Sequence, residues 1–383
     1  CFYGRNVCPD IGGIMEKYLT SKDLDFIKPV DTFTETRSSH VPAVRLEAVR
    51  KAAHKFRDEL LSSGTVPYFR AATLVNVPYP TRYAFFSVYN ESTFVSPIIH
   101  ITNRLFIIRF QTAAGLKTLL FSPSDIMANA ETRFFKRFAG GFITKLQGDG
   151  MKEIKQAAQQ LVAPMEHTVE EWLPIIGLKP EDIDCISYDH LHTQDVRNWL
   201  GTAERKAYFP NAKLLVMRQE WESATGLLPP QKDWYCPNGI AGIDPQKVVL
   251  LDEDVLLGPG LALVRTPGHT MGNHSLVVNT PAGIYVSSEN GVSADSYAPK
   301  HSRNNEIRQY AEKTGMEVIL NGNTQESGIE QYISMVMEKE IAGPAQQNGD
   351  FYNVFNSSQF SSYWMFPGIS PSFTFSDLEV GHL

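Results

Sequence analysis

The spacing of apolar residues predicts one long helix near the start of the chain, followed by a group of strands. Within residues 40–64 the apolar positions recur at helical intervals, and Gly64 ends the pattern. These positions are Val44, Val49, Ala53, Phe56 and Leu60. Runs of β-branched and aromatic residues, separated by Pro, Asn and Gly, come next and predict a sheet. They cover residues 69–80, 82–90, 96–111 and 116–125.

Helical and strand patterns alternate through the rest of the chain. Helices are predicted at residues 149–164, 168–178, after Met217, at 304–315 and at 328–343. Strands are predicted at residues 181–190, 213–217, repeatedly within 246–290, and at 316–323. Thr168, with Glu171 three residues later, forms a capping-box pattern at the start of its helix. Sheet, helix, sheet and helix in this order predict an α/β protein with two sheets between helical layers.

The order of the predicted helices and strands suggests three segments. Residues 1–64 form an N-terminal extension with the amphipathic helix, residues 65–343 form the main α/β domain, and residues 344–383 form a C-terminal arm. The arm is crowded with aromatic residues and interrupted by Pro367, Gly368 and Pro371. Its aromatic residues are Phe351, Tyr352, Phe355, Phe360, Tyr363, Trp364, Phe366, Phe373 and Phe375. Because disordered segments are poor in aromatic residues, we expect the arm to be packed against its own or a neighbouring subunit, as a pocket wall or in a homodimer.

Three histidines stand at places where strands are predicted to end. His190 and His192 follow the short apolar strand, and residues two apart on an extended backbone point to the same side. His269 lies in a turn between two apolar strands, and the carboxylate of Glu289 ends the strand after that. Three imidazoles with one open position are the ligand set of a catalytic zinc site. The spacing therefore predicts that one metal ion is held by His190, His192 and His269.

The motifs around these histidines resemble the metallo-β-lactamase superfamily, and most of all its lactonase-like hydrolases. "HLHTQD" is similar to the His-x-His-x-Asp-His loop of that family, "TPGHTMGNHSLVV" to its third-histidine segment, and "VSSEN" to the position of its bridging Asp. The likeness covers roughly residues 65–340. It implies a four-layer αββα sandwich, in which His190, His192 and His269 match the family's three-histidine site.

The chain departs from the family at every position of the second metal site. Gln194 stands where the family has Asp, Asp195 where it has His, Glu289 where it has the bridging Asp, and Asn323 where it has the last His. Neutral amides are poor metal ligands, so we expect one ion per chain, with Glu289 as a candidate fourth ligand. The alternative for Glu289 is a strand-end carboxylate bound to backbone. Asp195 is either a metal or water contact or the N-cap of a following helix.

The resemblance implies a metal-dependent hydrolase, in which a metal-bound hydroxide attacks a lactone, ester or amide of a small apolar substrate. Zn²⁺ is the expected metal, and Fe²⁺ or Mn²⁺ the alternative, because imidazole and carboxylate ligands suit all three. With Gln194 in place of the family's Asp, either Asp195 or Glu289 is the predicted proton carrier. Two other functions stay open. One is a mononuclear iron or manganese oxygenase-type enzyme, and the other is a non-catalytic binding member of the superfamily.

Composition and charge restrict the kinds of partner that we expect the chain to bind. A net charge of −7, with no local cluster of Lys and Arg, argues against a nucleic-acid partner. No apolar run approaches the roughly 18 residues that a membrane span requires. Four cysteines without a Cys-x-x-Cys pair indicate neither a disulfide framework nor a cysteine zinc knuckle. We therefore expect a cytoplasmic enzyme that acts on a small molecule.

Overall fold

The computed structural model describes residues 18–86, 88, 98–140, 161–322, 326–364 and 368–383. Within them the larger sheet has nine strands, eight of which follow one another in a single order. That order is β1 (Leu19–Thr20), β8 (Val248–Leu251), β7 (Lys213–Met217), β6 (Cys185–Ser187), β5 (Gly115–Phe121), β4 (Ile98–Thr112), β3 (Tyr68–Pro80) and β14 (Leu378–Gly381). The ninth, β13 (Ser358–Ser361), pairs with β4. From β1 to β5 the strands are parallel.

The second sheet is antiparallel and faces the first. Its order is β12 (Gly283–Ser287), β11 (His274–Thr280), β10 (Leu261–Arg265), β9 (Asp254–Gly258) and β2 (Lys28–Val30). Apolar side chains from both sheets share one core, in which Phe106 and Leu215 of the larger sheet join Leu263 and Val278 of the smaller. Because both faces of each sheet are covered, the strands are almost continuously apolar.

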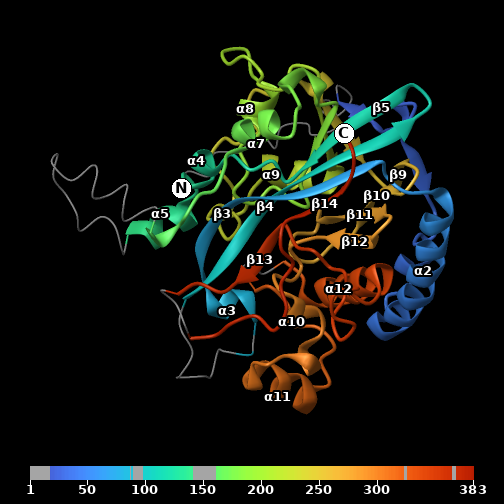
Figure 1. Ribbon diagram of the computed structural model, residues 1–383, viewed down its shortest axis with the longest axis vertical. Helices are drawn as coiled ribbons and strands as arrows, with labels where there is room; N and C mark the ends of the chain where they lie inside the picture. Colours follow the sequence, from blue (N-terminus) through green and yellow to red (C-terminus); the bar gives the residue numbers. More distant parts are fainter. Residues whose placement is uncertain (1–17, 87, 89–97, 141–160, 323–325, 365–367) are drawn as a thin grey trace, which may run out of the picture.

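Helices cover the outer face of each sheet. On the larger sheet, α7 (Val169–Ile175), α8 (Arg197–Leu200) and α9 (Arg218–Thr225) bury Trp172, Trp199 and Trp221. On the smaller sheet, α2 (Pro42–Ser63) and α12 (Gly328–Ala342) pack over β10, β11 and β12. The remaining α-helices in the described part of the chain are α3 (Thr81–Ala84), α4 (Ile126–Asn129), α5 (Arg133–Gly140), α10 (Ala294–Tyr297) and α11 (Asn305–Thr314). The predicted four-layer αββα sandwich is confirmed (Figure 1).

Most predicted elements are confirmed, including α2 and the capping box at Thr168. Two strand predictions are wrong. The segment expected to extend as a strand from residue 82 instead begins in α3, which includes Thr81–Ala84. Residues 316–322 form no strand, although Val318 and Ile319 are buried, because burial of an apolar run does not require pairing with a sheet. The helix predicted at residues 149–164 lies mostly outside the described residues.

The two ends of the chain contribute to the sandwich. β1 and β2 of the N-terminal segment extend the two sheets, while β13 and β14 of the C-terminal segment join the larger one. In the arm, Phe355 and Phe360 are buried in apolar cores of the same chain, whereas Trp364 is 70% exposed. Phe366 lies outside the described residues. The three segment boundaries remain predictions. No helix in the described ranges is long and apolar enough to cross a bilayer.

Candidate metal centre

The two sheets bring the three histidines together at one end of the sandwich. His190 and His192 lie in the loop after β6 of the larger sheet, and His269 lies in the loop between β10 and β11 of the smaller. One candidate ligand atom from each side chain lies within 4.8 Å of the others, and all three residues are buried. Within the described residues this is the cluster of His, Cys and carboxylate side chains that could hold a metal ion.

Distances within the cluster suit a single ion. Nδ1 of His192 lies 3.3 Å from Nε2 of His269. Two nitrogens bound at about 2.0–2.1 Å to one tetrahedral zinc are about 3.3 Å apart. Nε2 of His190 is buried and has no hydrogen-bond partner among the described residues. A buried ring nitrogen without a partner costs free energy, and a cation bound to that nitrogen would remove the cost. The three side chains therefore fit a metal ion.

Two glycines allow the His269 loop to pack closely. Gly268 has a φ of +152°, and a Cβ at this position would lie 2.2 Å from the Cα of Gln331 on α12. A Cβ at Gly272 would lie 2.2 Å from the backbone nitrogen of Glu220 on α9. Neither neighbour is the end of a flexible side chain, so a larger residue at either position would push the loop away from its supporting helix.

Asp189 was not singled out from the sequence, although it directly precedes His190. Its Oδ1 accepts hydrogen bonds from the backbone N–H of His190 at 2.9 Å and from Nδ1 of His190 at 3.0 Å. This bond directs Nε2 of His190 toward the centre, as carboxylate partners of metal-binding histidines do. Burial lowers the pKa of His190, but the charge and hydrogen bond of Asp189 outweigh it, and the pKa is raised to about 9.

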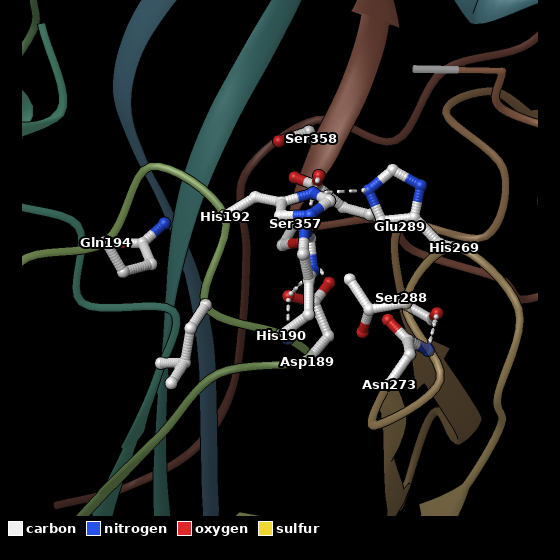
Figure 2. Close-up of polar contacts among 12 residues, drawn as sticks. Asp189, His190, His192, Gln194, His269, Asn273, Ser288, Glu289, Ser357 and Ser358 are labelled. Atoms are coloured by element: carbon white, nitrogen blue, oxygen red, sulfur yellow. Dashed lines mark hydrogen bonds and ion pairs between the residues drawn. The ribbon is translucent and has the colours of Figure 1, made fainter. Parts of the chain in front are cut away.

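Glu289 lies beside the histidines (Figure 2), with Oε2 3.8 Å from Nε2 of His190. Its side chain is 18% exposed and lines the pocket described below. Burial, together with the charge of Asp189, raises the pKa of Glu289 to about 7, against the opposite effect of His190. A carboxyl group with this pKa can both give and take a proton near neutral pH. Both predicted roles of Glu289, metal ligand and proton carrier, therefore remain predictions.

The other predicted site residues lie differently. Asp195 binds Arg197 through both carboxylate oxygens, accepts the backbone N–H of the same residue at 3.0 Å, and is not among the pocket-lining residues. Gln194 lines the pocket, and its Oε1 accepts a hydrogen bond from Ser124 at 3.2 Å. Figure 2 shows Gln194 on the side of His192 away from His269. Asn323 lies outside the described residues.

Glu220 is a second residue that sequence reasoning missed. Its buried carboxylate accepts hydrogen bonds from the backbone N–H of Leu191 at 2.8 Å, from the hydroxyl of Thr270 at 2.6 Å and from that of Tyr235 at 2.9 Å. It thereby joins the loop of His190 and His192 to the loop of His269. An acidic residue on the buried side of an amphipathic helix was the available signal, but its partners come from distant parts of the chain.

Two of the three histidines, His190 and His192, form part of the wall of a pocket of about 610 Å³. The polar part of the wall includes His190, His192 and Glu289. Elsewhere the wall is mainly apolar, with Val75, Val77, Ile101, Ile126, Phe134 and Trp234 among its residues. Ser357 and Ser358 of the C-terminal segment also line it. The arm therefore contributes to the pocket wall, which is one of the two arrangements predicted for it. A few polar groups in a largely apolar concave wall are typical of small-molecule sites.

Comparison with known proteins agrees with the resemblance seen in the motifs. The chain matches no known family profile. It is 30% identical over 115 residues to an N-acyl homoserine lactonase from a Bacillus species, and the match covers 30% of this chain and 40% of that protein. An N-acyl homoserine lactonase of Bacillus cereus is 30% identical over 105 residues, covering 27% of this chain and 36% of that protein. The chain is therefore similar to these lactonases over well under half of their length.

Among solved structures, the chain also matches AidC, described as a dizinc quorum-quenching lactonase in complex with a product. It is 14% identical to this chain, with a TM-score of 0.45, and the match covers 81% of this chain and 96% of AidC. No role of any residue follows from a likeness at this level.

Proposed function

We propose that this chain is a metal-dependent hydrolase of the metallo-β-lactamase type that opens a lactone, or cleaves a related ester or amide, in a small substrate with an apolar part. One observation carries the proposal: three buried histidines from loops of two different sheets meet beside a pocket whose wall includes His190 and His192 and is otherwise mainly apolar. The partial sequence similarity to N-acyl homoserine lactonases supports a lactone as the substrate class.

Zinc is the metal that we propose, held by Nε2 of His190, Nδ1 of His192 and Nε2 of His269. A zinc ion with an open position supplies a Lewis acid for the substrate carbonyl and, at neutral pH, a nucleophile derived from water. We also propose that this chain holds no metal ion at the position that corresponds to the second metal site of related enzymes. Gln194 is a neutral amide, and Asp195 is bound by Arg197.

The chain's own residues then divide the remaining work. Asp189 keeps His190 in the orientation and tautomer that present Nε2 to the centre. Glu289, with a pKa near neutrality and its carboxyl group at the pocket wall, is placed to pass a proton to the leaving oxygen or nitrogen. Apolar side chains around the pocket exclude water and bind the apolar part of the substrate. Asp195, which faces Arg197, is the less favoured proton carrier.

Metal analysis tests this proposal directly. Protein purified without added metal should contain about one zinc per chain, and His190→Ala and His269→Ala should lose both the metal and the hydrolysis of a lactone panel. His274→Ala is a matched control, because His274 is equally buried but bonds Ser187 at 3.0 Å instead of facing the cluster. Iron in place of zinc would favour oxygen chemistry, and no bound metal would favour a binding protein. Two fully occupied metal sites per chain would contradict the proposal, based on Gln194 and Asp195, that the second metal position is empty.

For the assembly and location we propose a cytoplasmic homodimer. The exposed side chain of Trp364 on the arm supports an apolar contact between subunits, and the buried free thiols of Cys185 and Cys236 suit a reducing compartment. Light scattering of the full chain should give the mass of a dimer, and Trp364→Ser should shift it toward the monomer. A wild-type mass of one chain would overturn the dimer.

A further inference from the structure

The C-terminal segment enters the larger sheet next to the candidate metal centre. β5 pairs with β4 from Thr112 to Phe106, and its last residue is Phe121. Beyond that point β13 takes over, pairing with β4 between His100 and Asn103 (Figure 1). At the junction the carbonyl of Ser357 accepts the backbone N–H of Arg104 at 2.8 Å. The arm therefore reaches the end of the sheet at which the loop carrying His190 begins.

From there the same segment follows the loop that carries Glu289. Phe355 donates its backbone N–H to the carbonyl of Val286 at 2.7 Å, and Phe360 donates to that of Val292 at 2.6 Å. Between them Asn356, whose side chain is fully buried, uses one amide group twice. Its Nδ2 donates to the carbonyl of Ser288 at 2.6 Å and to that of Gly291 at 2.7 Å. A single side chain thus holds the backbone on both sides of Glu289.

The next residue contacts the support of His190. The hydroxyl of Ser357 donates to Oδ2 of Asp189 at 3.0 Å, while Oδ1 of Asp189 binds His190. Ser357 and Ser358 also lie against the carboxyl group of Glu289, and their hydroxyls lower its pKa, although burial, the larger effect, raises it. All three arm residues are buried, and Figure 2 shows both serines beside Glu289 and Asp189.

We propose that Asn356 and Ser357 are positioning residues of the metal centre: Ser357 fixes the carboxylate that orients His190, and Asn356 fixes the turn that presents Glu289. The arm is then part of the active site and not only a covering of the sandwich. Partners of this kind usually change metal affinity or activity by about 10–100-fold when they are removed. The inference rests on the proposed function in so far as the histidine cluster must bind a metal.

Zinc competition against a chromophoric chelator, on the full chain, tests the inference. Ser357→Ala should weaken zinc binding by about 10–100-fold. Its matched control is Ser361→Ala, in β13 directly after Ser357, which should bind zinc as the wild type does because its side chain has no part in the contacts described above. In cobalt-loaded protein, Ser357→Ala should also shift the visible absorption bands, because these respond to ligand geometry, and Ser361→Ala should not. If Ser357→Ala acted only by lowering stability, the melting temperature of that metal-free variant would fall while its cobalt bands stayed as in the wild type, and the positioning role would be overturned.

The outcomes separate the two proposals. If the wild type binds zinc and Ser357→Ala binds it equally well with an unchanged cobalt spectrum, the positioning role is overturned and the proposed function stands. If the wild type binds no zinc, both fall. Asn356→Ala should reduce turnover at saturating zinc through displacement of Glu289. Should that variant fail to fold, Ser357→Ala still decides the inference.

Discussion

Glu220 accepts the backbone N–H of Leu191 at 2.8 Å, so a buried carboxylate on α9 holds the residue that stands between His190 and His192. The same carboxylate accepts the hydroxyl of Thr270, next to His269. Burial raises the pKa of Glu220, while the charge of His190 and the hydrogen bonds from Thr270 and Leu191 lower it. One side chain therefore sets the separation of the two loops that carry the candidate ligands.

Glu220→Ala should weaken zinc binding by about 10–100-fold, because the two loops lose their common acceptor. It should also lower the free energy of unfolding by about 3 kcal/mol, since buried donors are left unpaired at about 1–3 kcal/mol each. Zinc titration and urea denaturation measure the two effects. Glu222→Ala, on the same helix but only partly buried, is the control and should change neither. Unchanged zinc affinity in Glu220→Ala would remove Glu220 from the support of the site.

The two candidate proton carriers can be separated by kinetics. Glu289→Gln should lower kcat by about 10²–10⁴-fold if Glu289 moves the proton, because that is the usual contribution of general acid–base catalysis. Asp195→Asn should have a much smaller effect, since Asp195 is bound by Arg197 and does not line the pocket. Steady-state rates at saturating zinc give the comparison. A large loss in Asp195→Asn, with Glu289→Gln near the wild type, would reverse the assignment.

Zinc binding should release a proton from His190. Burial lowers the pKa of His190, but Asp189 and Glu289 raise it to about 9, so the metal-free protein carries a proton there at pH 8. A ligand imidazole must be neutral, so the proton on His190 should weaken zinc binding about tenfold at pH 8 and about twofold at pH 9, and this effect should vanish at higher pH. At pH 8 Glu289, with a pKa of about 7, is already mostly ionised.

Calorimetry in two buffers of different ionisation enthalpy counts the released protons. About two protons per zinc are expected at pH 8, one from His190 and one from the water that zinc would acidify, and fewer in Asp189→Asn, because that variant loses the charge that raises the pKa of His190. Equal proton release by the wild type and Asp189→Asn would show that the proton does not come from His190.

Glu338 on α12 should make stability depend on pH. Burial raises its pKa to about 7, against hydrogen bonds from Tyr297, Asn290 and Ser275. The folded protein thus keeps a proton that the unfolded chain releases, and the stability associated with Glu338 falls as pH rises from about 4.5 to about 7. The loss amounts to about 3 kcal/mol and is complete above that window.

The comparison with Glu338→Gln isolates this residue, because other groups titrate equally in both proteins. The difference in unfolding free energy between the variant and the wild type should move by about 3 kcal/mol in favour of the variant from pH 4 to pH 8. Urea denaturation across this range measures it. The exposed Glu312→Gln should show no such trend, and a flat difference for Glu338→Gln would contradict the raised pKa of Glu338.

Local sequence patterns were sufficient to predict many of the helices and strands of this protein. The helical spacing of Val49, Phe56 and Leu60 predicted α2, and these three side chains are buried. Strand composition predicted β3, β4 and β5, and the histidine motifs indicated which residues would meet. Such signals lie within a few neighbouring residues, where periodicity and turn chemistry act directly on the backbone. The strand predicted at residues 316–322 failed because an apolar run does not show whether its backbone pairs with a sheet.

Only the tertiary structure decided what supports the site. The hydrogen-bond donors to Glu220 come from residues 191, 235 and 270, and Ser357 donates to Asp189 across 168 positions of sequence. A hydrogen bond between distant residues leaves no periodic trace in either segment, because its geometry depends on how the sheets and helices pack. The same packing placed Glu289 at the pocket wall, whereas the contact between Asp195 and Arg197 is local, two positions apart. Sequence alone therefore identified the candidate ligands, while their orientation and the pKa values around them depend on buried contacts that folding creates.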